Sequence, residues 1–182
     1  MVYSVEELVK MANKKKVKYV FFWGHKTTLD HVTKACFSQW FPSKFQDGHG
    51  NTYLSAEHYM MVKKAELFGD AVMSAKTLEC SIPAKAKAYG RQVRGFDQAV
   101  WDRHKFDIVV DGNLLKFSQD NDMKEFLLST QGRVLVEASP VDRIWGIGLA
   151  VDHEYAENPN LWRGENLLGF ALMKVRDQLL AA

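Results

Sequence analysis

The stretch from Ser55 to Phe68 constrains the fold most, because it predicts a helix whose apolar side also carries charge. Ser55 can cap the start of this helix, Glu57 suits its positive first turn, and Gly69 provides an end. At about 100° per residue, one side of the helix combines three apolar and two charged residues: Met60, Met61, Phe68, Glu57 and Lys64. Tyr59, Lys63 and Glu66 take the opposite face.

The two charged residues on the apolar side require an explanation. Burying an unpaired charge costs roughly several kcal/mol, so Glu57 and Lys64 are expected to line a cleft or to meet partners. Two structural alternatives remain open at this point: a buried ion pair, or an apolar side that is only half covered.

Composition predicts one soluble domain spanning residues 1–182, long enough to bury a core. A net charge of +2 favours neither a strongly basic nucleic-acid surface nor an acidic tail. Cys36 and Cys80 have neither CxxC nor zinc-site spacing, and we expect free thiols in a reducing cytosol. The start, Met1–Glu7, is too polar for a signal peptide, and no apolar run approaches a membrane span, which predicts a cytoplasmic location.

Periodicity predicts a helix-rich chain with a few short strands and no evident βαβ alternation, which is the α+β class in a compact, mostly helical domain. Helices are predicted at Ser4–Lys14, Ser55–Phe68, Asp70–Ala75, Pro83–Tyr89, Trp101–Lys116, Met123–Ser129 and Leu167–Leu180. Strands are predicted at Val17–Trp23, Thr52–Leu54 and Arg133–Glu137. Loops or irregular segments are predicted at Thr27–Thr33, Phe37–Phe45, Asp47–Asn51 and Glu154–Leu161. In the last helix the predicted core stripe is Leu168, Leu172, Val175 and Leu179, with Asn166 as the cap.

Several familiar catalytic motifs do not occur in the sequence. It contains no HExxH, GxSxG, P-loop or GxGxxG pattern. Its six histidines form no i, i+4 pair of the kind that binds a metal on a helix. We therefore expect neither a metal site nor a cofactor.

Carboxylates and tryptophans near glycine turns are the remaining candidates for chemistry. Asp142 and Trp145 follow a predicted strand, which would hold their loop in place. A second cluster, 162–169, joins Trp162 to a tight turn and a helix N-terminus, where anions bind readily. Each residue also has a structural alternative: the tryptophans as core, Asp142 as a turn former, and Asn166 as a cap and nothing more.

Together these residue types fit the cleavage of a glycosidic bond in a nucleoside-like substrate. An aromatic plane can stack on a base, which is worth about 1–3 kcal/mol. A carboxylate can stabilise an oxocarbenium-like ribosyl cation or orient water against it. Arginine or lysine can hold a phosphate.

The chain resembles the YbiA/NADAR family from about residue 17 to residue 180. The blocks that carry the resemblance are Phe37–Phe45, Ser55–Tyr59, Lys64–Asp70, Ala84–Arg91, Trp101, Lys116–Phe117, Leu135–Ala138, Asp142–Gly148 and Trp162–Gly169. The family's usual LSNF block here ends in Gln39 and Trp40, and this departure affects a segment that can border the substrate.

The resemblance implies a metal-independent N-glycosidase on a compact α+β fold. It assigns catalysis to Glu57 and Asp142, and substrate binding to four further residues: Trp101, Trp145, Lys64 and Arg91. As a hypothesis, one carboxylate stabilises the ribosyl cation and positions water, a tryptophan stacks on the leaving base, and the cations neutralise phosphate.

The family resemblance leaves three functions open. The first is hydrolysis of early riboflavin-biosynthesis intermediates, which releases ribose 5-phosphate from an amino-pyrimidine. The second is removal of ADP-ribose from guanine in nucleic acid, which would favour a basic groove. The third is a non-catalytic module that binds ADP-ribose or NAD, although binding alone would not require both Glu57 and Asp142. The expected partners are therefore a small phosphoribosyl or ADP-ribosyl molecule, with nucleic acid only as a modified substrate.

Overall fold

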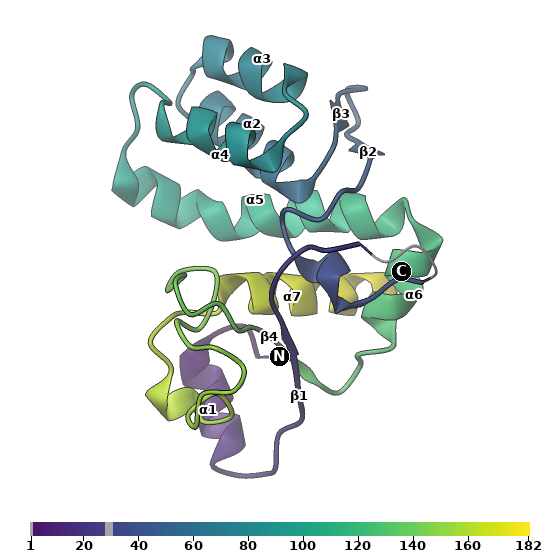
Figure 1. Cartoon of the computed structure of the whole chain (residues 1–182), viewed down its shortest axis with the longest axis vertical. Coiled ribbons are helices and arrows are strands. Elements are labelled where there is room, and N and C mark those ends of the chain that lie inside the picture. Colours follow the sequence, from purple (N-terminus) through teal and green to yellow (C-terminus); the bar gives the residue numbers. More distant parts are fainter. Residues whose placement is uncertain (1, 28–30) are drawn as a thin grey trace.

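A two-stranded parallel sheet joins two segments that are far apart in the chain (Figure 1). Strand β1, Tyr19–Phe22, pairs with β4, Val134–Glu137, so that Phe22 lies opposite Glu137. The computed structural model describes residues 2–27 and 31–182. Its other elements are α1 (Val5–Ala12), η1 (Lys34–Phe37), β2 (Phe45–Gln46), β3 (Thr52–Tyr53), α2 (Ala56–Leu67), α3 (Ala71–Glu79), α4 (Pro83–Arg91), α5 (Gln98–Ser118), α6 (Asn121–Leu128), η2 (Pro159–Leu161) and α7 (Leu167–Ala181).

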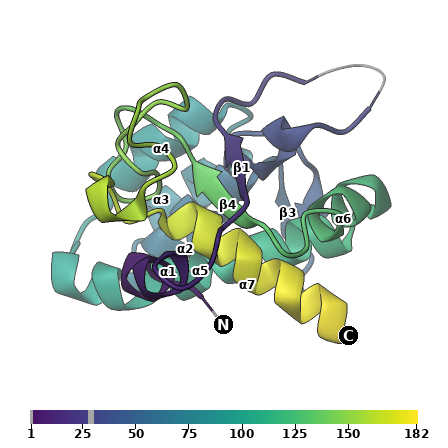
Figure 2. The same cartoon turned by 90° about the horizontal axis from the view of Figure 1, so that it is seen from below.

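Helix α5 divides the molecule into two parts (Figure 1). Helices α2, α3 and α4 pack together, and α2 also packs against α5. Helix α7 lies on the other side of α5, between α5 and the sheet (Figures 1 and 2). The predicted α+β class, mostly helical with a few short strands, is confirmed.

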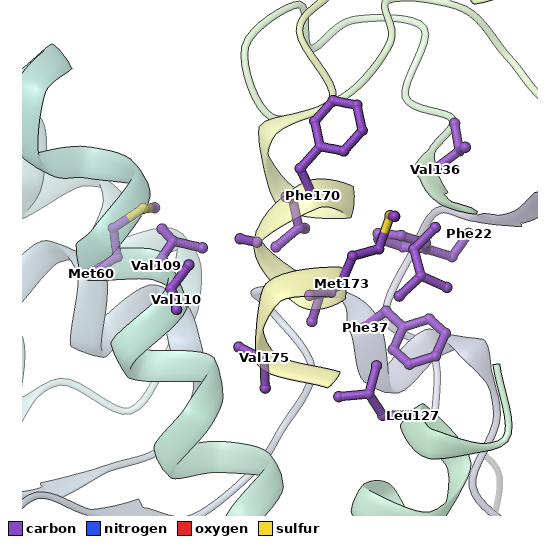
Figure 3. Close-up of a cluster of buried hydrophobic side chains, with 14 of the residues drawn as sticks. Phe22, Phe37, Met60, Val109, Val110, Leu127, Val136, Phe170, Met173 and Val175 are labelled. Carbon is purple, nitrogen blue, oxygen red and sulfur yellow. The ribbon is translucent and has the colours of Figure 1, made fainter. Parts of the chain in front are cut away.

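The main core fills the space on both sides of α7 (Figure 3). Figure 3 shows Val109 and Val110 of α5 on one side of α7, and Phe22 and Val136 of the two strands on the other. The predicted stripe of α7 is buried at Leu168, Leu172 and Val175, and Leu179 packs at its edge. Because Phe170, Ala171 and Met173 are buried as well, α7 is a central helix with more than one buried side.

Helix α2 forms where the sequence predicts it and is buried on both faces. The Ser55 hydroxyl accepts a hydrogen bond from the His58 N–H, as expected of the cap. The face opposite Glu57 is also covered, because Tyr59 packs against Phe45 and Tyr53 of the β2–β3 hairpin. The hairpin strand β2 begins at Phe45, the last residue of the segment predicted to be irregular.

The segment 138–166 connects β4 to α7 and is tied together by its own backbone. Ile147 N–H donates to the carbonyl of Glu137, and Arg163 N–H donates to the carbonyl of Ile147, so the two halves of the segment run close to each other. A side chain at Gly164 would overlap the backbone of Gly146 and Arg143. The segment is consequently rigid although most of it, apart from η2, lies outside helices and strands, and it holds Asp142 and Trp145 in place.

Asn166 is the N-cap residue of α7, as predicted, and its carbonyl accepts a hydrogen bond from the Phe170 N–H, but its side chain does not cap the helix. Its backbone is left-handed, with φ of 53°, and its side chain makes no hydrogen bond to the helix. Instead, its Oδ1 accepts from the Glu137 N–H at 2.9 Å, and its Nδ2 donates to the Leu135 carbonyl at 2.9 Å. The predicted position of the cap is therefore correct, whereas the side chain links α7 to β4 and does not bond to the helix N-terminus.

Three further predictions concern the two cysteines, the loop at residues 27–33 and membrane-spanning helices. Cys36 and Cys80 are buried, unpaired thiols. The loop predicted at residues 27–33 lies partly outside the described residues. Across residues 2–27 and 31–182, none of the helices has the length and apolar character that crossing a membrane requires.

Candidate active site

A cavity of about 430 Å³ opens where the carboxyl ends of β1 and β4 face α2, α4 and the start of α5. Ligands commonly bind beyond the carboxyl ends of parallel strands, because loops and helix termini meet there. The cavity wall includes all six residues predicted for the site: Glu57, Asp142, Trp101, Trp145, Lys64 and Arg91. Their roles in catalysis and binding remain predictions.

Glu57 is a carboxyl group enclosed in the cavity wall. Its residue is only 4% exposed, and it lies in the first turn of α2. Burial raises the pKa of Glu57 to about 7, although the charge of Lys87 and a hydrogen bond from the Trp40 side chain act in the opposite direction. The carboxyl group is therefore able to exchange a proton near neutral pH.

Asp142 is fixed by the turn in which it lies. Its Oδ1 accepts hydrogen bonds from the N–H groups of Ile144 and Trp145, both at 2.8 Å, while its own N–H donates to the Ser139 hydroxyl at 3.1 Å. The structural interpretation of Asp142 as a turn former is thus correct. The second carboxylate oxygen, Oδ2, takes no part in these turn bonds, so a role towards a ligand is also possible for the same side chain.

Cationic side chains from α2 and α4 contribute the other charge of the cavity. Lys64 is half-buried, and burial followed by the neighbouring Arg91 charge lowers its pKa. Its Nζ lies 4.3 Å from the ring centre of Phe96 and 5.5 Å from that of Trp101. No salt bridge between Glu57 and Lys64 occurs in the part of the chain that the structure describes, so the two residues do not form the buried ion pair considered above.

Aromatic rings surround the cavity at different depths. Trp101 is 8% exposed and belongs to the core as well as to the cavity wall, whereas Trp23, just after β1, is 61% exposed. The Trp40 ring lies 5.7 Å from the His25 ring, and Lys87 Nζ lies 5.8 Å from the Trp40 ring centre. These planes can hold a flat ring inside the cavity and a second one at its mouth.

Gln39, one of the two departures from the family pattern, lies in the cavity wall with a fixed amide. Its Oε1 accepts a hydrogen bond from Asn113 Nδ2 at 2.8 Å, and Asn113 also donates to the Val109 carbonyl. Its Nε2 has no hydrogen-bond partner among the described residues. The Nε2 group is thus a buried donor whose hydrogen-bonding capacity is not met by the described residues.

A buried lysine supports the segment that carries Gln39. Lys116 of α5 is 1% exposed, and its Nζ donates to the carbonyls of Cys36 at 2.6 Å and Ser38 at 3.1 Å. Burial lowers its pKa to about 8. Lys116 therefore joins α5 to the end of η1 and thereby positions the wall segment that follows.

Two charged residues of the cavity wall were missed by the sequence prediction: Glu137 and Lys87. A signal for each was present in the sequence. Glu137 is a charged residue that directly follows three apolar strand residues, and Lys87 precedes Arg91 by four residues, which places both on one face of α4. A charged side chain at the end of a buried strand indicates a functional site when that end of the strand is itself buried.

The cluster at 162–169, considered as an anion site, contributes Leu168 to the cavity wall, and its use as an anion site stays a prediction. Trp162 is absent from the cavity wall, packs against Tyr19 with ring centres 6.3 Å apart, and donates its indole N–H to the Ala156 carbonyl at 2.8 Å. Its alternative interpretation as core is the correct one. Within the described ranges, no three His, Cys, Asp or Glu side chains are grouped so that they could hold a metal ion.

Comparisons with known proteins identify a family and several relatives of this chain. The NADAR domain model matches residues 21–180. N-glycosidase R617 of Acanthamoeba polyphaga mimivirus is 48% identical over 165 residues, which is 88% of this chain and 96% of the viral protein. The chloroplastic riboflavin biosynthesis protein PYRR of Zea mays is 32% identical over 157 residues, 79% of this chain but 23% of the maize protein. The NMR structure of E. coli YbiA matches with a TM-score of 0.68 at 24% identity, over 92% of this chain and 88% of that one.

These similarities define an enzyme, a hydrolase that acts on N-glycosyl bonds. The chain belongs to the NADAR domain family, as its sequence blocks indicate.

Proposed function

We propose that the enzyme hydrolyses the bond between ribose 5-phosphate and the amino group of a small pyrimidine, of the kind formed early in riboflavin synthesis. The observation that carries the proposal is the lining of the cavity, which combines carboxyl groups with cations and aromatic planes. Its volume of about 430 Å³ lies at the small end of the roughly 300–1,000 Å³ typical of small-molecule sites. The similarity to a maize protein named for riboflavin biosynthesis supports the same substrate class.

In this proposal each group in the cavity has a chemical task. Lys64, Lys87 and Arg91 hold the phosphate by charge-assisted hydrogen bonds. A tryptophan plane, from Trp101 or Trp145, stacks on the pyrimidine. The carboxylates of Glu57 and Asp142 face the positive charge that develops on the ribose as the bond to nitrogen breaks, and Glu57 also takes a proton from the attacking water.

A second candidate is hydrolysis of ADP-ribose from guanine in nucleic acid. The feature that favours it is the exposed Trp23 at the mouth of the cavity, together with Val141, which is 84% exposed. These side chains could contact the part of a larger substrate that the cavity does not enclose. A module that binds ADP-ribose or NAD without cleaving it is the third possibility.

Purified protein incubated with two substrates side by side separates the three candidates. One substrate is a phosphoribosylamino-pyrimidine, the other an oligonucleotide that carries ADP-ribosylated guanine, and mass spectrometry follows both. Release of ribose 5-phosphate from the first alone supports the proposal. Regenerated guanine from the second alone contradicts it in favour of the second candidate, and unchanged substrates that nevertheless bind favour the third.

Substitution of Arg91 by methionine tests the phosphate assignment. Loss of one charge-assisted hydrogen bond of about 1.5–3 kcal/mol predicts a rise in KM of about 10- to 100-fold for the phosphorylated substrate. The same pyrimidine with an unphosphorylated ribose should show a KM within about twofold of wild type, because it has no phosphate for Arg91 to contact. Lys85→Met is the matched control, since it removes one positive charge from an exposed position of α4 outside the cavity. Equal effects of the two substitutions would remove Arg91 from the phosphate site.

A further inference from the structure

Glu137 is an ionisable group of the cavity that the proposed reaction has not yet used. It is the last residue of β4, and its backbone is held on both sides: the N–H donates to Asn166 Oδ1, and the carbonyl accepts from the Ile147 N–H. Its Oε2 is buried and has no hydrogen-bond partner among the described residues. A buried carboxyl oxygen without a partner is costly when the group is charged, so this cavity-lining residue favours its protonated form.

The charged groups around Glu137 come from three different elements. Glu57 approaches from α2, Lys87 from α4, and Asp142 from the segment that follows β4. Burial is the main cause that raises the pKa of Glu137 to about 8, and the charges of Asp142 and Glu57 act in the same direction, while Lys87 opposes them. At neutral pH Glu137 consequently keeps its proton beside Glu57, a carboxyl group whose pKa burial raises less far, to about 7.

We propose that Glu137 is the general acid of the reaction and donates its proton to the leaving nitrogen, while Glu57 accepts a proton from the attacking water. This inference rests on the proposed hydrolysis of an N-glycosyl bond. An amine leaves poorly as an anion, so a proton delivered to the nitrogen during bond cleavage lowers the barrier. Such general acid catalysis typically raises the rate by about 100- to 10,000-fold. A pair of carboxyl groups with different proton affinities is the arrangement that separates acid from base.

The proposed step balances in atoms and charge. The bond between the anomeric carbon and nitrogen breaks, its electron pair stays on nitrogen, and the Glu137 proton forms the N–H bond of the free amine. A water oxygen forms the new bond to the anomeric carbon, and one water proton passes to the Glu57 carboxylate. Transfer of that proton from Glu57 to Glu137, directly or through a water molecule, restores the starting state.

The pH profile follows from the two protonation states. Activity requires Glu57 without its proton and Glu137 with it, so kcat/KM should rise as the pH passes about 7 and fall as it passes about 8. Because the two groups interact, the two limbs belong to the pair and not to either residue alone. Replacement of Glu137 by glutamine removes the acid, and the alkaline limb should disappear with it.

The test compares the wild type with Glu137→Gln on two substrates. On the phosphoribosylamino-pyrimidine, kcat should fall by about 100-fold or more, and the residual rate should no longer decline above about pH 8. On 4-nitrophenyl riboside 5-phosphate, whose leaving group needs no proton, the loss should be much smaller. Glu137→Asp keeps a carboxyl group and should retain an alkaline limb. Glu125→Gln, an exposed position on α6, is the matched charge control.

Each outcome decides between the two proposals. If Glu137→Gln keeps activity within about fivefold, or keeps the alkaline limb, the acid role is wrong although the proposed function stands. If the variant loses ribose 5-phosphate binding together with turnover, Glu137 is structural and the inference also fails. If the wild type cleaves neither ribosyl substrate while it remains folded, the proposed function itself fails.

Discussion

Replacement of Glu57 by glutamine is expected to lower kcat by about 1,000-fold or more and to leave ribose 5-phosphate binding within a few-fold. The two side chains have the same shape, and the amide oxygen can still accept the hydrogen bond from Trp40. Only the ionisable oxygen is lost, and with it both the charge opposite the ribosyl cation and the acceptor for the water proton. Mass-spectrometric turnover and calorimetric binding measure the two quantities separately.

The matched control for this prediction is Glu66→Gln on the same helix. Glu66 is exposed, lies outside the cavity, and pairs with Lys63 at the surface, a contact of small energy. Its substitution changes the net charge equally and should leave kcat within about twofold. Turnover by Glu57→Gln close to that of the control would exclude Glu57 from the chemistry. Loss of product binding together with turnover would instead indicate a disturbed cavity.

Gly169→Ala should destabilise the protein by about 3 kcal/mol and lower its melting temperature by about 6–12 °C. A Cβ at this position of α7 would overlap the Leu135 carbonyl oxygen and both polar atoms of the Asn166 side chain. The Leu135 backbone and the hydrogen-bonded Asn166 side chain are both fixed in position and cannot shift to make room. Helix α7 therefore has to move away from β4. Since Asn166 also holds the Glu137 N–H, turnover should fall with stability.

Gly48→Ala provides the control for the glycine substitution. Gly48 lies in the exposed turn between β2 and β3, and an alanine Cβ at this position would have no other atom within 4 Å. The melting temperature of this variant should stay the same or rise slightly, because alanine restricts the unfolded chain. Thermal unfolding followed by circular dichroism compares both variants with the wild type. A Gly169→Ala protein that melts within 2 °C of wild type, roughly the effect of under 1 kcal/mol, would show that α7 can move without cost.

Local signals in the sequence predict the helices well. Helix α2 begins and ends within one residue of the prediction, because Ser55 and Gly69 provide a cap and an end. Helix α5 begins earlier than the prediction at Trp101, since Asp97 is the actual cap and accepts a hydrogen bond from Val100. For these elements, cap residues and periodicity contain the needed information.

The pairing of β1 with β4 could not be predicted in the same way. Their sequences indicate strands but not a shared sheet, because parallel partners are joined by no turn and are far apart in the chain. This pairing places the end of β1 beside Glu137. Because the pairing was not predicted, the position of Glu137 in the cavity wall was missed. Glu57 and Asp142 were found because a buried charge on a helix and an acidic loop residue after a strand are visible locally.

The two enclosed carboxyl groups also link the fold to acidity. Their pKa values are raised from 4.5 to about 7 for Glu57 and about 8 for Glu137, so each binds a proton more tightly when the chain is folded. Their contribution to stability is therefore fully present below about pH 4.5 and is lost as the pH rises through 7 and 8. Either glutamine variant should melt higher than wild type at about pH 9 and not at about pH 4.5. The Glu137 proton that the proposed reaction transfers to nitrogen is thus also a proton that stabilises the fold. Alkaline solution removes this proton and with it both effects.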